Sequence, residues 1–182
     1  LQAELDQPQT ALEALEPVMD LVEESGLTGS ERARLYMLHA TSMLMTQPTN
    51  PATSRSLAHA NELGRHEGDV FAAELHLLQS RIQRVIGHYP NFRDHLMHAW
   101  RLIEHGKPSS LGSTVAGLLG WSNRVAGAVD ASASWQGRAR RIAVQTGEPS
   151  ARAHAEVGVA EWQYARGMLA ESEATAVSAL TV

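Results

Sequence analysis

Three glycines recur at a fixed interval in the second half of this 182-residue chain. Gly87, Gly127 and Gly167 are 40 residues apart. Three other columns of residues keep the same period: Ser80, Gly120 and Ala160; Tyr89, Val129 and Leu169; and Ala99, Ala139 and Ala179. A period of this length predicts one structural unit that is copied along the chain and buries its apolar face against the next copy.

Each column has a physical explanation. Glycine adopts the left-handed backbone conformation without steric cost, and a residue in that conformation often closes a helix. Small side chains at a fixed offset let two helices approach closely. The apolar residue two positions after each glycine is expected to close the end of the helix pair. Gly167 therefore predicts a turn between two helices rather than a defect within one.

The rest of the chain reads as helices separated by turn signals, and no segment has the alternation typical of strands. Pro17 predicts a kink or break in the first helix, while Ser30 and Asp130 are the expected N-caps of two others. We expect an all-α fold, a right-handed superhelix of antiparallel helical hairpins (an α-solenoid). It forms a single array over residues 1–182, and because the chain opens on Leu1 we expect a fragment of a longer protein. The expected parts are an orphan helix at 9–24 and hairpins at about 31–64, 69–105, 110–146 and 149–180.

Composition excludes several classes of protein. The chain has no cysteine, which excludes disulfides and thiolate metal sites. Residues 1–31 carry eight acidic side chains and no Lys or Arg, whereas residues 32–170 carry 15 basic and 10 acidic ones, a net charge of +5. This excess is mild, which argues against direct nucleic-acid binding. No apolar run is long enough to cross a bilayer and no signal peptide opens the chain, so we expect a cytoplasmic protein without a membrane partner.

No catalytic constellation is present. The chain has no nucleophile elbow, phosphate-binding loop or H-E-x-x-H motif, so we expect neither an enzyme nor a cofactor. His95 and His98 share a helix face at a spacing that metals use, but a site needs a third ligand, so no metal is expected. Trp100, Trp135 and Trp162 are expected to pack between helices.

The repeat unit resembles a known family. In the segment from Ala151 to Leu180, Ala160, Gly167 and Ala179 fall where the tetratricopeptide repeat places its small and turn residues. The 40-residue period is longer than the usual form and resembles the sensor arms of large bacterial ATP-binding regulators of the LuxR type. The resemblance implies that the first helix of each hairpin lines a concave groove.

This register gives the candidate groove residues. Arg84 and Arg124, which are 40 residues apart, are expected to stack along one wall. A guanidinium group can grip a carboxylate with two hydrogen bonds, and side-chain amides can pair with a peptide backbone. The alternative is that the arginines are solvated or salt-bridged and the amides pack between helices. The candidates are Arg34, Arg81, Gln83, Arg84, Trp121, Asn123, Arg124, Gln163 and Tyr164, with Met37, Leu77, His154, Val157 and Glu161 beside them.

These features together predict a non-catalytic module that binds a protein or peptide partner. The resemblance implies a regulatory or sensor role within a larger bacterial signalling or transcription-regulatory protein. Two alternatives stay open: an intracellular receptor for a small peptide or metabolite, and a self-assembly module that forms a homodimer. A Met-rich stretch with Met37, Met43 and Met45 is expected in the core, or as an adaptable contact surface in the second alternative.

Overall fold

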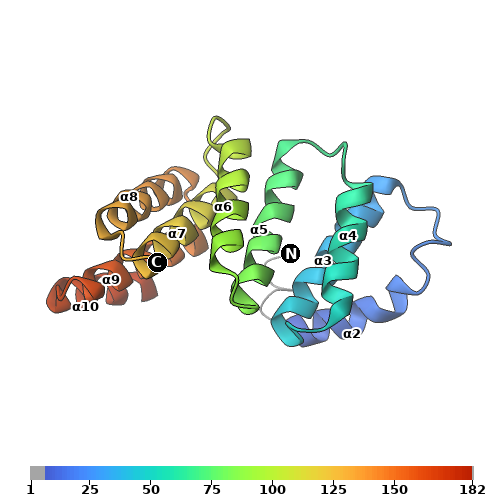
Figure 1. The fold of residues 1–182 in the computed structure, drawn as a ribbon, viewed down its shortest axis with the longest axis horizontal. Helices are drawn as coiled ribbons and strands as arrows, with labels where there is room; N and C mark the ends of the chain where they lie inside the picture. The colour runs from blue at the N-terminus through green and yellow to red at the C-terminus, as the bar shows by residue number, and fades with distance from the viewer. Residues whose placement is uncertain (1–6, 182) are drawn as a thin grey trace. The chain divides into compact units, whose positions relative to one another are not determined.

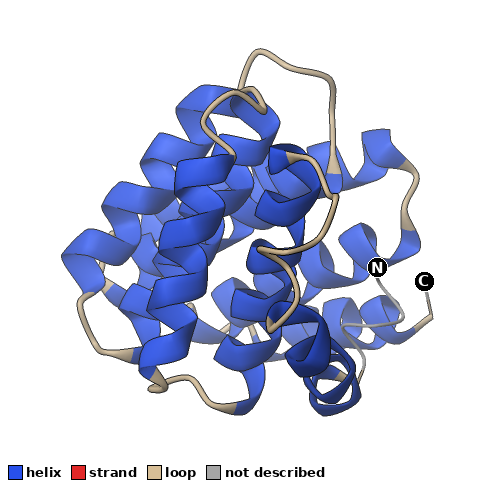
Figure 2. Ribbon diagram, turned by 90° about the vertical axis from the view of Figure 1, so that its right-hand side faces the viewer, coloured by secondary structure: helices blue, strands red, loops and turns tan. Residues whose placement is uncertain are grey.

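A computed structural model describes residues 7–181, and these residues contain helices and turns but no strand (Figure 2). The all-α class predicted from the sequence is therefore confirmed. The helices, labelled in Figure 1, are α2 (Pro8–Met19), α3 (Gly29–Thr46), α4 (Pro51–Leu63), α5 (Asp69–Val85), α6 (Tyr89–Ile103), α7 (Ser110–Val125), α8 (Val129–Thr146), α9 (Pro149–Ala165) and α10 (Leu169–Leu180). Within the described residues, none of the helices combines the length and the apolarity that a membrane span needs.

The chain divides into two compact units, Leu1–His95 (unit 1) and Leu96–Val182 (unit 2). In unit 1, α3 packs against α2 and α4, and α5 contacts both α3 and α4. In unit 2, α7 packs against α8, α9 packs against both of them, and α10 packs against α9. The pairs of helices expected from the repeat, α3 with α4, α7 with α8 and α9 with α10, are thus in contact.

The three periodic glycines form the turns that their spacing predicts. Gly87, Gly127 and Gly167 have φ angles of 81°, 77° and 76°, the left-handed region that glycine adopts most readily. At each turn the glycine N–H donates to the carbonyl oxygen three residues earlier, and the next N–H donates to the carbonyl five residues earlier. At Gly127 these two bonds measure 3.0 and 2.8 Å. This is the Schellman motif, and its threefold recurrence confirms the glycine prediction.

The apolar column after the glycines was interpreted wrongly. Tyr89 and Leu169 were expected to close the helix pair, yet 48% and 61% of their surfaces are exposed. Each is the first residue of its helix, and because Cα–Cβ bonds tilt toward the helix N-terminus, its side chain extends past the end of the preceding helix. The position three residues later is the enclosed one: Phe92 and Ser132 are fully buried.

Three helix boundaries also differ from the expectation. Thr28, not Ser30, caps α3: its hydroxyl accepts from the Glu31 N–H, while the Glu31 carboxylate accepts from the Thr28 N–H at 2.8 Å. Asp130 lies in the first turn of α8 rather than at its N-cap. The break predicted at Pro17 is confirmed, since α2 ends at Met19, five residues before the expected Glu24.

The two units have different cores. Unit 1 buries large side chains, among them Phe71, Leu75 and Leu78. The core of unit 2 is built largely from small residues, and a single amide fills the space between its helices. Gln136 of α8 is 3% exposed, and a Cβ added at Gly120 would lie 2.6 Å from its Nε2 atom. A Cβ at Gly158 of α9 would overlap the same amide. Small residues therefore let α7, α8 and α9 approach closely around Gln136.

Candidate functional site

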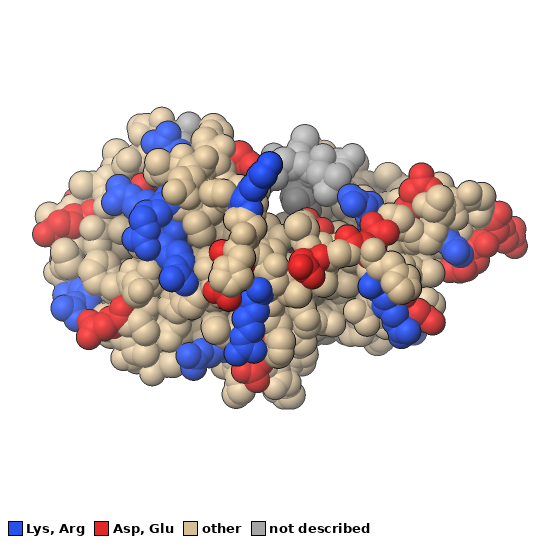
Figure 3. Space-filling view, turned by 90° about the horizontal axis from the view of Figure 1, so that it is seen from above, with Lys and Arg blue, Asp and Glu red and all other residues tan. Residues whose placement is uncertain are grey.

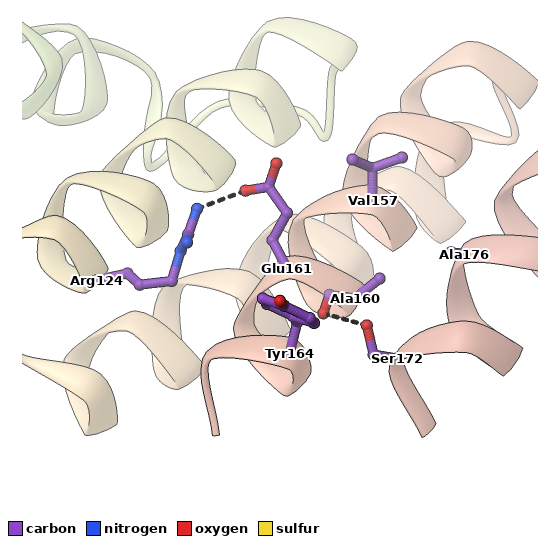
Figure 4. A pocket seen from close by; sticks show the side chains of 7 residues that line it. All are labelled: Arg124, Val157, Ala160, Glu161, Tyr164, Ser172 and Ala176. Atoms are coloured by element: carbon purple, nitrogen blue, oxygen red, sulfur yellow. Dashed lines mark hydrogen bonds and ion pairs between the residues drawn. The ribbon is translucent and has the colours of Figure 1, made fainter. Parts of the chain in front are cut away.

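A groove in unit 2 is the strongest candidate site. It has a volume of about 390 Å³ and is formed by α7, α9 and α10 (Figure 4). We call it the unit 2 groove, and its lining residues are Arg124, Val157, Ala160, Glu161, Tyr164, Ser172 and Ala176.

The helical period places these side chains together. Val157, Glu161 and Tyr164 occupy positions i, i+4 and i+7 of α9, so they share one face of that helix. Ser172 and Ala176 are one turn apart on α10. The Ser172 hydroxyl donates to the Ala160 carbonyl oxygen at 2.9 Å, which ties α10 to α9 across the floor.

An ion pair forms one wall of the groove. Arg124, in the last turn of α7, donates from Nη2 to the Glu161 carboxylate of α9 at 2.6 Å. The C-terminal position on α7 also favours a cation, because the helix dipole is negative there. The Nε atom of Arg124 is buried and has no hydrogen-bond partner. The guanidinium group is thus already engaged by Glu161, so a ligand carboxylate would have to compete with that side chain.

The opposite part of the groove is apolar and open to solvent. Tyr164 is 68% exposed and Val157 is 47% exposed. Beneath them Ala160, Ala176 and Ser172 have short side chains, and this absence of bulk creates the hollow. The groove therefore offers an aromatic and an aliphatic contact next to a charged pair, which is a surface suited to binding rather than to bond breaking.

The structure divides the candidate residues of unit 2 into two groups. Arg124 and Tyr164 line the groove, as the register predicts. Asn123 is only 4% exposed, and its Nδ2 donates to the Leu119 carbonyl of its own helix at 2.7 Å, so its side chain belongs to the interior. Gln163 has a buried, unpaired Oε1 atom, and Trp121 on α7 is half-buried. For Asn123 and Gln163 the alternative of amides packed between helices fits best.

The candidates of unit 1 have local partners of their own. Arg34 lies 4.0 Å from the Glu67 carboxylate, and it opposes the burial that raises the pKa of Glu74. Burial lowers the pKa of the Arg81 guanidinium, and neighbouring Arg84 adds to the effect. Gln83 faces a separate cavity described below.

The expected stack of Arg84 on Arg124 would join the two units. Arg84 belongs to unit 1 and Arg124 to unit 2, so this wall stays a prediction.

Three residues of the groove were not among the predicted site residues. Ala160 was read as a packing residue, and Ser172 and Ala176 lie on the second helix of the pair, whereas the resemblance implied a groove lined by first helices alone. Their signal in the sequence is the run of small residues in α10, which leaves space beside α9.

Basic side chains gather over α8 in unit 2 on the face drawn in Figure 3. The exposed arginines of this helix are Arg138, Arg140 and Arg141. Arg140 donates to the Glu156 carboxylate at 2.7 Å. The guanidinium carbon of Arg138 lies 5.1 and 5.0 Å from the ring centroids of Trp100 and Trp135, which contact each other edge to face at 5.2 Å.

Two of these three arginines therefore take part in packing within unit 2. The edge-to-face contact of Trp100 and Trp135 also confirms their predicted packing role. Trp162 packs as predicted too, since its Nε1 donates to the Val129 carbonyl of α8 at 3.3 Å.

The histidine pair predicted on one face of α6 has other contacts. His95 lies against His76 of α5, with 3.2 Å between their Nδ1 atoms. Among residues 7–181, no group of three or more His, Asp or Glu side chains is arranged to hold a metal ion.

Comparisons with family models, with curated proteins and with solved structures found no match to this chain.

Proposed function

We propose that this chain is a non-catalytic binding module and that the unit 2 groove holds a segment of a protein or peptide partner. The observation that carries the proposal is the exposure of Tyr164 and Val157 above a hollow floor of small residues. Large apolar side chains exposed beside a hollow are typical of interaction sites, and tyrosine is enriched at the residues that dominate binding energy.

The groove favours a particular kind of peptide. An apolar or aromatic side chain of the partner would fill the hollow and pack against Tyr164 and Val157. The Arg124–Glu161 pair offers both donors and acceptors, which suits the N–H and C=O groups of an extended backbone. Because Glu161 already neutralises Arg124, the peptide needs an apolar anchor more than an acidic group.

Two wider aspects of the proposal rest on the 40-residue period and the tetratricopeptide resemblance. The helix pairs would continue as a right-handed superhelix of antiparallel hairpins, with grooves of this kind along its concave side. The module would then serve a larger bacterial signalling or transcription-regulatory protein as its regulatory or sensor segment.

Selection of binding peptides tests the proposal directly. A random peptide library displayed on phage is panned against the chain, and enriched peptides are titrated by fluorescence anisotropy. We expect enriched sequences to share an apolar anchor and to bind with a Kd below about 100 μM, which is about 5.5 kcal/mol of binding free energy. Tyr164→Ala should weaken binding by tenfold or more, as expected for a buried anchor contact.

A matched pair of valine variants controls for effects outside the groove. Val157→Ala removes two methyl groups from the groove, whereas Val144→Ala removes them from an equally exposed part of α8 that does not line it. Only the first should weaken binding. The proposal fails if no peptide is enriched, or if the enriched peptides bind the parent and Tyr164→Ala equally well. Sedimentation of the same samples separates peptide binding from self-association.

A further inference from the structure

A second cavity lies in unit 1, away from every contact used above. It has a volume of about 340 Å³ and lies between α4, α5 and the start of α6. Five of its eight lining residues are polar: Ser54, Asn61, Gln79, Gln83 and His95. We call it the α4–α5 cavity.

The cavity contains two acceptors that lack donors. The Oε1 atoms of Gln79 and Gln83 are both buried, and neither has a hydrogen-bond partner. A buried carbonyl oxygen without a donor is costly, and native proteins usually satisfy such groups with protein, water or a ligand. Both oxygens belong to residues that line the cavity, so the space beside them is where a donor would come from.

The spacing of these two glutamines defines the ligand. They are four residues apart on α5, which places their attachment points about 6 Å apart along the helix. Across the cavity, α4 contributes the Asn61 amide and the Ser54 hydroxyl, so donors and acceptors are available on a second wall. Leu57 and Ile82 complete the lining with apolar surface, which suits the carbon skeleton of a small molecule.

Charge narrows the class further. None of the eight lining residues is Asp, Glu, Lys or Arg. A charged ligand entering this cavity would lose hydration without meeting an opposite charge, which is unfavourable. A volume of about 340 Å³ is near the lower end of the range for small-molecule sites, roughly 300–1,000 Å³.

We propose that the α4–α5 cavity binds an uncharged small molecule that carries at least two O–H or N–H donors about 6 Å apart, of the size of a disaccharide, nucleoside or dipeptide amide. The Gln79 and Gln83 carbonyl oxygens accept these donors, and Asn61 and Ser54 contact the opposite side of the molecule. This site is independent of the unit 2 groove, so either can fail without the other.

Saturation-transfer NMR on the whole chain tests this site with defined probes. Sucrose, uridine and N-acetyl-alanyl-glutamine amide represent hydroxyl, nucleoside and amide donors, and uridine monophosphate is the charged counterpart of uridine. We expect at least one uncharged probe to bind with a Kd below about 1 mM, and uridine monophosphate to bind more weakly than uridine. The class that binds identifies the source of the donors.

Substitution of the two acceptors connects binding to the cavity. Gln79→Met and Gln83→Met keep the side-chain length and remove the oxygens, and each should raise the Kd about three- to tenfold. The double variant should melt no lower than the parent, because it removes two unsatisfied buried groups. Its fold is checked by circular dichroism.

Asn61→Leu provides a second test from the α4 wall, and Asn91→Leu, an exposed residue outside the cavity, is its control. Tyr164→Ala should bind the probe like the parent. The proposal is overturned if no uncharged probe binds below about 5 mM, which would leave water as the occupant of the cavity. Equal binding by the parent, the methionine double variant and Asn61→Leu would overturn it as well.

Discussion

Two glycine-to-alanine substitutions in unit 2 should change stability in opposite directions. Gly127 has a φ angle of 77°, and a Cβ built there meets no atom within 4 Å. The cost of Gly127→Ala is therefore one of backbone conformation alone, about 1–2 kcal/mol for an L-residue in the left-handed region. Gly137 lies inside α8, where an added Cβ would meet only Arg141 Nη1 at 3.6 Å, an ordinary contact. Gly137→Ala should gain about 0.8–1 kcal/mol of helix propensity.

Thermal unfolding followed by circular dichroism or calorimetry measures both effects. For a chain of this size, 1 kcal/mol changes Tm by about 2–4 °C. Gly127→Ala should then lower Tm by about 2–8 °C, while Gly137→Ala should raise it by about 2–4 °C. The two variants carry the same chemical change in the same unit, so composition and unfolded-state effects largely cancel. Equal Tm values, or the reverse order, would refute the assignment of Gly127 as a left-handed helix cap.

Three further outcomes are expected. Gly158→Ala should cost about 1–3 kcal/mol, because its methyl group would overlap the buried Gln136 amide, and Gln136→Ala in the same chain should restore part of the lost Tm. Burial and the Glu23 hydrogen bond raise the pKa of Tyr36 to about 12, so absorbance at alkaline pH should show one late-titrating tyrosine that is absent from Tyr36→Phe. Since unfolded tyrosine ionises near pH 10, stability should fall between about pH 10 and 12. Burial lowers the pKa of His39, so the folded state excludes a proton that the unfolded chain binds; the free energy of unfolding should fall as pH drops below about 6.5, and less so in His39→Gln.

The turns could be predicted from the sequence because their determinant is local. A left-handed backbone at Gly87, Gly127 and Gly167 depends on the absence of a Cβ at one residue, and this requirement is visible in the sequence. The capping of α3 was missed by two residues because both Thr28 and Ser30 are suitable caps, and only Thr28 has a glutamate three positions later to complete the reciprocal pair. The sequence pattern already contained that distinction.

The packing of unit 2 depends on contacts between distant residues. Gln136 is a polar residue in a helix that reads as amphipathic, and nothing local indicates that it is buried. It is buried because Gly120 and Gly158, 16 and 22 residues away in the chain, leave room for its amide between α7 and α9. Likewise, the pairing of Arg124 with Glu161 requires α7 and α9 to be neighbours in space. The sequence could place both charges on groove-facing positions but could not indicate that they neutralise each other.

The 40-residue period also explains which residues can differ between repeats. Gln83, Asn123 and Gln163 occupy equivalent positions, and the backbone carbonyl of each accepts the same Schellman hydrogen bond. Their side chains nevertheless differ: Asn123 bonds within its own helix, whereas Gln83 faces a cavity. The period therefore specifies the backbone role of a position and leaves its side chain free to vary. Arg124 and Tyr164 are also equivalent, and they line one groove because equivalent positions of adjacent repeats lie side by side. A groove built from such a column can change what it binds by single substitutions without any cost to the turns that hold it, and this is why the proposed specificity is assigned to Tyr164 and its neighbours rather than to the periodic residues.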